Sequence, residues 1–175
     1  MKKAGNNENL PFVLVILDGW GIAKPSDSNA IYLAKKPTYD HLIKRYPNTT
    51  LLASGKNVGL PNGQDGNSEA GHMNIGAGRV AKQDAVIVND MIKDGSFFKS
   101  RVLFQALNHA KKYKSNVHLM GLLSNGQSAH SEPRHLYALL KFFADNKFHR
   151  VYLHLFTDGR DSSQHAAARL ISKLI

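Results

Sequence analysis

The 175-residue sequence contains no cysteine, only one tryptophan and no long hydrophobic run. The absence of cysteine excludes a disulfide framework, a thiolate metal site and a cysteine nucleophile, and it fits a reducing compartment. No apolar stretch approaches the roughly 20 residues that a membrane-spanning helix needs. The run Phe12–Leu17 is too short for a signal peptide and is not followed by a cleavage site, so we interpret it as a strand. We therefore expect a cytoplasmic protein that does not associate with membranes.

Acidic residues are also scarce, and the positive charge that results is unevenly distributed. Lysine and arginine number 23 against 13 aspartate and glutamate, which gives a net charge of +10. Residues 1–75 carry 8 basic and 6 acidic side chains, whereas residues 76–175 carry 15 and 7. The basic second part suggests anionic partners such as small phosphorylated or carboxylated substrates, although a solvated lysine-rich surface explains it equally. Nucleic acid is disfavoured, because the basic residues are mostly isolated and no nucleic-acid-binding signature is present.

Hydrophobic periodicity and turn residues predict strands that alternate with helices. The expected strands are 12–17, 49–53, 116–123 and 150–157. The expected helices are 28–46 (capped by Asp27 or Ser28 and kinked or divided by Pro37), a short one from Ser68 to about residue 76, then 84–94, 98–113, 133–146 and 163–175. This order predicts an α/β fold with a mostly parallel sheet flanked by helices.

The first predicted strand ends at Asp18, which is followed by Gly19. Ligands bind open α/β sheets at the carboxyl ends of the strands, and aspartate is a hard oxygen ligand suited to Mg²⁺ or Mn²⁺. An ordinary Asp-Gly turn explains the same two residues. Asp18 is therefore a candidate metal ligand with a purely structural alternative.

Ser68 follows the glycine-rich loop 55–67 and opens a short helix. A hydroxyl at this position meets exposed backbone N–H groups and the positive end of the helix dipole, which suits an incoming phosphoryl group. A neighbouring metal ion could lower the pKa of the hydroxyl and make it a nucleophile. The alternative interpretation is that Ser68 is simply the N-cap of its helix.

Two further loops follow predicted strands in the basic part, at residues 124–131 and 157–161. Consecutive parallel strands bring such loops together. Arg160 can hold a carboxylate or phosphate with two hydrogen bonds, Asp161 can accept a proton from a hydroxyl, and His130 can bond or protonate a phosphoryl oxygen. A charged surface turn and a structural histidine remain the alternatives.

The same residues resemble one known enzyme family. The stretch Gly59–Arg79, GLPNGQDGNSEAGHMNIGAGR, closely resembles the nucleophile segment of the cofactor-independent (2,3-bisphosphoglycerate-independent) phosphoglycerate mutases. LDGWGI at Leu17–Ile22 looks like that family's amino-terminal metal motif. SNGQSAHS at Ser124–Ser131 and DGRD at Asp158–Asp161 look like its two substrate loops. The resemblance covers almost the whole chain, with the motifs in the same order.

This resemblance implies a fold and an activity. The family belongs to the alkaline phosphatase superfamily and interconverts 3-phosphoglycerate and 2-phosphoglycerate with two Mn²⁺ ions, or sometimes Mg²⁺. A phosphatase domain carries the metals and the serine, and a second domain inserted in it grips the glycerate. Residues 1–80 would then be the first part of the phosphatase domain. Residues 81–175 would be the linker and the first part of the inserted α/β domain.

Residue roles follow from the same resemblance. Asp18 and Ser68 would bind one metal ion, and Ser68 would be the nucleophile that forms a phosphoserine. His130, Arg160 and Asp161 would hold the glycerate and its phosphate. The expected partner is this small-molecule substrate, and the complete enzyme is expected to be a monomer.

The sequence also departs from the family pattern. The substrate loop usually reads Ser-Asp-Gly-Gly-Val-His-Ser-His, whereas here Asn125 replaces the aspartate, Glu132 replaces the last histidine, and one residue is added before His130. Asp65 stands where the family usually has methionine, close to the nucleophile. It could perturb metal affinity or face solvent.

Length is the largest departure, because family members are roughly three times as long, the size of two complete domains. The apolar helix that reaches Ile175 suggests a truncated module, or a helix docked at a natural terminus. We expect the remaining metal ligands to lie elsewhere and this chain to be inactive and poorly folded by itself. The alternatives are a non-catalytic remnant that binds phosphoglycerate or nothing, and a related metal-dependent phosphohydrolase or phosphomutase.

Overall fold

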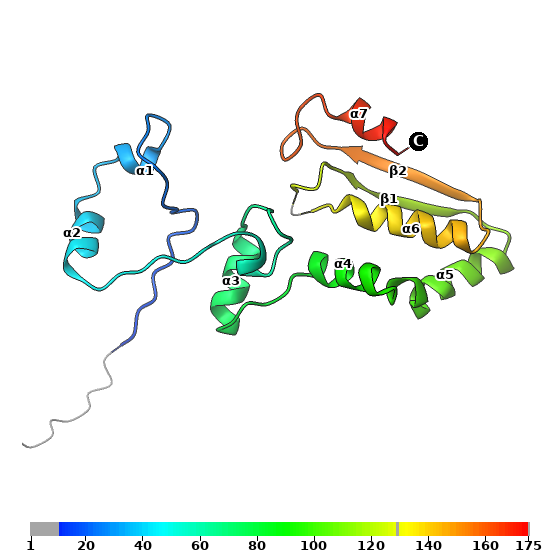
Figure 1. Ribbon diagram of the computed structural model, residues 1–175, viewed down its shortest axis with the longest axis horizontal. Coiled ribbons are helices and arrows are strands. Elements are labelled where there is room, and N and C mark those ends of the chain that lie inside the picture. Colours follow the sequence, from blue (N-terminus) through cyan, green and yellow to red (C-terminus); the bar gives the residue numbers. More distant parts are fainter. Residues whose placement is uncertain (1–10, 129, 175) are drawn as a thin grey trace, which may run out of the picture. The chain divides into compact units, whose positions relative to one another are not determined.

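The structure is a computed structural model that describes residues 11–128 and 130–174 (Figure 1). These residues form two compact units, one that ends at Thr50 and one that begins at Leu51. The domain boundary that the resemblance implies, between residues 80 and 81, stays a prediction.

The first unit contains two short helices, α1 (Ala30–Leu33) and α2 (Pro37–Arg45). The predicted division of the 28–46 helix at Pro37 is confirmed, because Pro37 is the first residue of α2, where its missing N–H costs no hydrogen bond. The cap of α1 is Asn29 rather than Asp27 or Ser28. The Asn29 side chain accepts a 3.0 Å hydrogen bond from the Tyr32 N–H.

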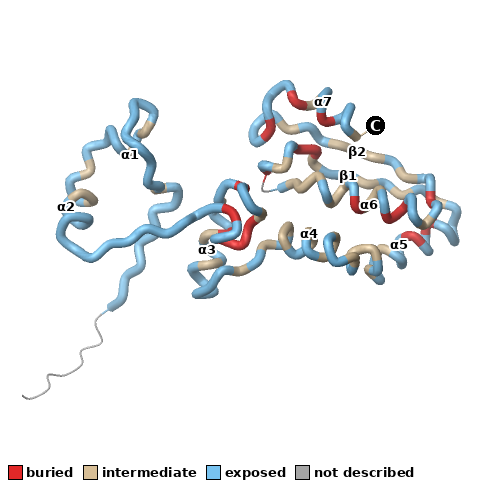
Figure 2. The backbone as a smooth tube through the Cα atoms, viewed as in Figure 1, coloured by how far each residue is buried: buried red, intermediate tan, exposed pale blue. Residues whose placement is uncertain are grey.

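Two of the predicted strands do not form. Residues 12–17 and 49–53 have no strand structure, and their apolar side chains are exposed, as Figure 2 shows for both segments. Phe12 is 91% exposed and Leu51 is 89% exposed. A strand needs a neighbouring strand to satisfy its backbone N–H and C=O groups, and the described residues provide no such partner for either segment.

The second unit begins with the glycine-rich loop and its short helices. The loop contains the 3₁₀ helix η1 (Gly55–Val58) and leads into α3 (Ser68–Ala77), close to the prediction for the Ser68 helix. Val58, Leu60 and Ala70 pack together as a small core. This core holds the loop against the first turn of α3.

The remainder of the second unit alternates helices and strands as predicted. Its elements are α4 (Asp84–Asp94), η2 (Phe97–Lys99), α5 (Arg101–Lys112), β1 (Val117–Leu123), α6 (Pro133–Asp145), β2 (Val151–Thr157) and α7 (Ala167–Ser172). The strands β1 and β2 pair in parallel with Val117 opposite Val151 and Leu123 opposite Thr157. The α/β class with a parallel sheet is thereby confirmed. The last helix begins at Ala167, four residues later than predicted.

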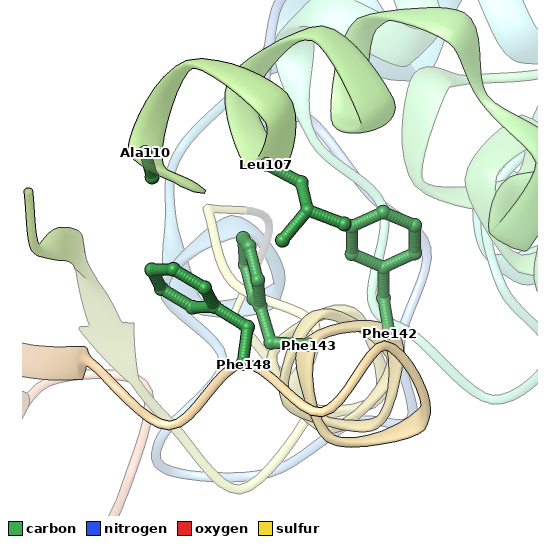
Figure 3. Close-up of a cluster of buried hydrophobic side chains, with 5 residues drawn as sticks. All are labelled: Leu107, Ala110, Phe142, Phe143 and Phe148. Atoms are coloured by element: carbon green, nitrogen blue, oxygen red, sulfur yellow. The ribbon is translucent and has the colours of Figure 1, made fainter. Parts of the chain in front are cut away.

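The main hydrophobic core lies between α5, α6 and one face of the sheet (Figure 3). Phe142 and Phe143 from α6 meet Leu107 from α5, and Phe148 closes the cluster. In α5, Leu107 and Ala110 are buried, whereas Val102 is exposed. A second cluster joins α7 to the carboxyl ends of the strands through Leu123, Ala166 and Leu170.

The other face of the strand pair is exposed in the described part of the chain. It presents Met120, Tyr152 and Phe156, which are 71%, 52% and 61% exposed. Among the residues that the structure describes, helices therefore cover one face of the strand pair. No helix among residues 11–128 and 130–174 has the length and apolar character required to cross a membrane.

Candidate active site

Ser68 is the first residue inside α3, and the helix cap is its neighbour Asn67. The Asn67 side chain accepts a 2.8 Å hydrogen bond from the Ala70 N–H, which satisfies one of the free donors at the helix start. The interpretation of Ser68 as the N-cap is therefore wrong. Ser68 is exposed at the amino end of a ten-residue helix, where the helix dipole favours negative charge.

Two glycines let the loop before Ser68 pass close to other backbone segments. A Cβ at Gly66 would collide with the carbonyl oxygen of Ala53, and a Cβ at Gly59 would collide with that of Ala81. Gly59 also has a φ of +77°, in the left-handed region that glycine tolerates best. The loop therefore approaches its neighbours in a way that no larger residue permits at these two positions.

Hydrogen bonds of its own serine hydroxyls hold the loop after β1 in place. The Ser131 hydroxyl donates to the Leu122 carbonyl at 2.6 Å, and the Ser124 hydroxyl accepts from the Gly126 N–H at 3.1 Å. The Ser128 hydroxyl accepts from the His130 N–H at 3.1 Å. These bonds fix the backbone at His130, whose side chain is exposed.

The loop after β2 is organised by Asp158. Its carboxylate accepts three backbone hydrogen bonds, from the N–H groups of Arg160, Asp161 and Ser162 at 2.8, 3.2 and 2.6 Å. These bonds, the one from Arg160 foremost, lower the pKa of Asp158. Asp158 is a supporting residue that our site prediction did not name, although aspartate before glycine at a turn is a signal that points to it.

The two loops after the strands are joined to each other, as consecutive parallel strands predict. The Asn125 N–H donates to the Ser162 hydroxyl at 3.1 Å. Ser162 is 3% exposed, so this contact lies inside the structure. The carboxyl ends of β1 and β2 therefore present one continuous surface.

A cavity of about 380 Å³ connects this surface to the loop that leads into Ser68. One wall is the segment Asp65–Asn67, directly before Ser68. The other wall consists of Gln127, His130, Arg160 and Asp161. The structure thus brings the three predicted substrate-binding residues together beside the predicted nucleophile segment. Their individual roles stay predictions.

Charge in the cavity is mixed. The Arg160 side chain is 92% exposed, and its Nε lies 3.9 Å from an Asp161 carboxylate oxygen, so the two make only a weak surface ion pair. The guanidinium can therefore turn to an incoming anion at little cost. Asp65 lines the same cavity and places a carboxylate in the opposite wall.

Glu132, which replaces the family's second histidine, has a local role. Its carboxylate caps α6 by accepting from the Arg134 N–H at 3.2 Å and pairs with the Arg134 guanidinium at 2.8 Å. The bond to Arg134 lowers the pKa of Glu132. Glu132 does not line the 380 Å³ cavity. This difference from the family pattern therefore lies outside the cavity wall that contains His130.

The two predicted metal ligands belong to different units of the structure. Asp18 lies in the first unit, in a turn where the Trp20 N–H donates to the Leu17 carbonyl at 3.1 Å, and Ser68 lies in the second. Carboxylate and hydroxyl oxygens suit Mn²⁺ or Mg²⁺, but two donors are too few for either ion. Within the described ranges, no three histidine, aspartate or glutamate side chains gather as a metal site would require. The shared metal site stays a prediction.

Comparison with known proteins identifies the family. The profile described as BPG-independent PGAM N-terminus (iPGM_N) matches residues 88–175, half of the chain. The chain belongs to the 2,3-bisphosphoglycerate-independent phosphoglycerate mutase family. It is 52% identical over 157 residues to the phosphoglycerate mutase of Methanococcoides burtonii, and 49% identical over 163 residues to that of Acholeplasma laidlawii. The matches cover 90% and 93% of this chain.

A solved phosphoglycerate mutase has a similar fold. The structure from Leishmania mexicana, determined at low cobalt concentration, matches with a TM-score of 0.74 and 34% identity over 85% of this chain. The match covers 27% of that chain, and the chain spans 30% and 32% of the length of the two curated mutases above. The chain therefore corresponds to about a third of a phosphoglycerate mutase.

Proposed function

We propose that this chain supplies the nucleophile and part of the substrate site of an enzyme that interconverts 3-phosphoglycerate and 2-phosphoglycerate. The observation that supports the proposal most directly is the cavity between the segment before Ser68 and the residues His130, Arg160 and Asp161. A site for a phosphorylated acid needs a positioned nucleophile and cationic donors on the facing wall. The proposal is supported by the presence of His130 and Arg160 in the lining of this cavity, together with the segment Asp65–Asn67 that leads into Ser68.

The proposed reaction has two transfers on one serine. The Ser68 hydroxyl attacks the phosphorus, an O–P bond forms to Ser68, the bond from phosphorus to the glycerate oxygen breaks, and the serine proton passes to that glycerate oxygen. Glycerate then reorients and takes the phosphoryl group back on its other hydroxyl, so that the Ser68–phosphorus bond breaks. Arg160 and His130 hold the anionic groups, and Asp161 accepts the proton of the attacking glycerate hydroxyl, which returns to the Ser68 oxygen as its bond to phosphorus breaks.

A divalent metal would neutralise phosphate charge and lower the pKa of the serine hydroxyl. We propose that Asp18 and Ser68 contribute to its site and that the other ligands come from residues outside those described here. The number of ions, their identity as Mn²⁺ or Mg²⁺, a monomeric state and a cytoplasmic location are further parts of the proposal.

The test is a chimera in which this chain replaces the matching residues of the Methanococcoides burtonii mutase, to which it is 52% identical. We expect the chimera to convert 3-phosphoglycerate into 2-phosphoglycerate, as followed by phosphorus NMR, and to lose that activity with EDTA and regain it with Mn²⁺. Release of inorganic phosphate alone would identify a phosphohydrolase instead. A folded chimera without turnover would favour the non-catalytic remnant. The 175-residue chain alone serves as the control and should show no turnover.

Asp158 should control how well the Arg160 loop is ordered. We expect Asp158→Asn to speed amide hydrogen exchange in residues 157–163 about tenfold, because asparagine carries no charge and presents one acceptor oxygen for three N–H groups. The pKa of Asp158 is lowered in the folded state, so its contribution is complete above the ordinary value of 3.8 and is lost as the pH falls below it.

The matched control for this prediction is Asp94→Asn. The Asp94 carboxylate also accepts a backbone hydrogen bond, from the Ser96 N–H at 2.8 Å, and its pKa is also lowered. Asp94 lies at the end of α4, so its replacement should leave exchange in residues 157–163 unchanged. Mass spectrometry of the chimera compares the two variants, and equal effects would refute the role of Asp158.

A further inference from the structure

Gln64 makes a buried hydrogen bond between two loops that are distant in the sequence. Its side-chain Nε2 donates to the Ser128 carbonyl at 2.7 Å, across 64 residues. Both residues are buried, with 7% and 2% of their surface exposed. We infer that Gln64 is a positioning residue that sets the width of the candidate active-site cavity. This inference deepens the proposed function and rests on it.

The bond joins two residues that are sequence neighbours of the two walls of the cavity. Gln64 directly precedes the wall segment Asp65–Asn67, and Ser128 directly follows Gln127 in the facing wall. In the part of the chain that the structure describes, this is the side-chain hydrogen bond that joins residues 51–67 to residues 124–131. A change at this bond therefore moves one wall relative to the other.

The backbone on both sides of the Gln64–Ser128 bond is itself held by hydrogen bonds, so a shift at this bond displaces the attached backbone. The Gln64 carbonyl accepts from the Gly55 N–H at 2.9 Å, and its N–H donates to the Pro61 carbonyl at 3.2 Å. On the facing side, the Ser128 hydroxyl accepts from the His130 N–H. Gln64 is thereby coupled through Ser128 to the backbone of His130, a proposed phosphate-binding residue.

The chemistry of the bond requires an amide N–H₂ at this position. A carbonyl only accepts hydrogen bonds, so the amide nitrogen of Gln64, not its oxygen, must face Ser128. The Gln64 oxygen Oε1 is itself buried and accepts no hydrogen bond from the described residues. Replacing the amide by an apolar group of similar length therefore removes one buried donor and leaves the Ser128 carbonyl unsatisfied.

The implied domain boundary at residues 80 and 81 would place Gln64 and Ser128 in different domains. Their bond would then hold the glycerate-binding wall against the phosphoserine while glycerate reorients. If the walls separate, water reaches the phosphoserine. The bond from phosphorus to Ser68 then breaks, the water oxygen bonds to phosphorus and gives inorganic phosphate, the serine regains its proton, and glycerate leaves.

The experiment is Gln64→Met in the chimera, with 2-phosphoglycerate and inorganic phosphate measured together. We expect kcat for the mutase reaction to fall about tenfold and the ratio of released phosphate to 2-phosphoglycerate to rise. The matched control is Gln83→Met, which removes an amide that donates to the Ala81 carbonyl at 3.1 Å within one turn. Its product ratio should equal that of the unmodified chimera.

A rescue variant separates positioning from simple destabilisation. In Gln64→His, a ring N–H can donate to Ser128, so the product ratio should return towards that of the unmodified chimera. If Gln64→Met fails to fold, a ratio in Gln64→His above that of the unmodified chimera overturns the positioning role. The positioning role is overturned if Gln64→Met leaves the ratio of released phosphate to 2-phosphoglycerate unchanged. It is also overturned if Gln64→His raises this ratio as much as Gln64→Met does. An unmodified chimera that makes no 2-phosphoglycerate overturns the proposed function instead.

Discussion

Replacing Ser68 with alanine in the chimera is expected to lower mutase turnover by at least about a thousandfold and to abolish the phosphoenzyme. The reason is that the hydroxyl oxygen is the only atom of this side chain that can carry the phosphoryl group. Intact-mass spectrometry after incubation with 3-phosphoglycerate should show the added phosphate in the parent chimera and not in Ser68→Ala. A phosphorylated alanine variant would mean that another residue is the nucleophile.

The fold should tolerate this substitution. Asn67 caps α3 through the Ala70 N–H, so this capping bond remains when alanine replaces Ser68. Alanine has the higher helix propensity, and we expect the free energy of unfolding to change by no more than about 1 kcal/mol. The control is Ser100→Ala, because Ser100 is the N-cap of α5 without a side-chain capping bond. This variant should keep full activity.

Arg160 is expected to have the second largest effect. We expect Arg160→Ala to reduce kcat/KM by about a hundredfold, mostly through a higher KM, because two charge-assisted hydrogen bonds to the substrate are lost. Arg160→Lys should recover only part of this loss, since an ammonium group cannot make the paired contact. Steady-state kinetics at two ionic strengths measures both variants.

The control for Arg160 is another exposed arginine in the same unit. Arg169 lies on α7, does not line the cavity and is exposed. Arg169→Ala removes the same charge, so its kcat/KM should stay within about twofold of the parent. If both arginine variants lose activity equally, general positive charge attracts the substrate and Arg160 has no special contact with it.

Local patterns in the sequence predicted the second unit well. The elements α4, β1, α6 and β2 begin and end within about one residue of the expected ranges, because each has a clear hydrophobic period and a turn residue at its ends. The parallel pairing follows from the helix between the two strands. The convergence of His130, Arg160 and Asp161 followed in turn from that pairing.

The errors arise where structure depends on distant partners. Phe12–Leu17 has the composition of a buried strand, but composition alone does not provide a neighbouring strand. Asn67 and Ser68 are both good caps, and their preference alone does not decide which of them takes the position. The bond from Gln64 to Ser128 spans 64 residues and has no local signal at all.

The strand pair β1 and β2 has a consequence for protein synthesis. Because Val117 pairs with Val151 across a single intervening helix, the pair can condense as soon as β2 has left the ribosome. The apolar run Phe12–Leu17 emerges much earlier and has no partner in the described part of the chain. Throughout that interval its apolar side chains stay exposed on the nascent polypeptide, which favours aggregation before the rest of the chain has been made.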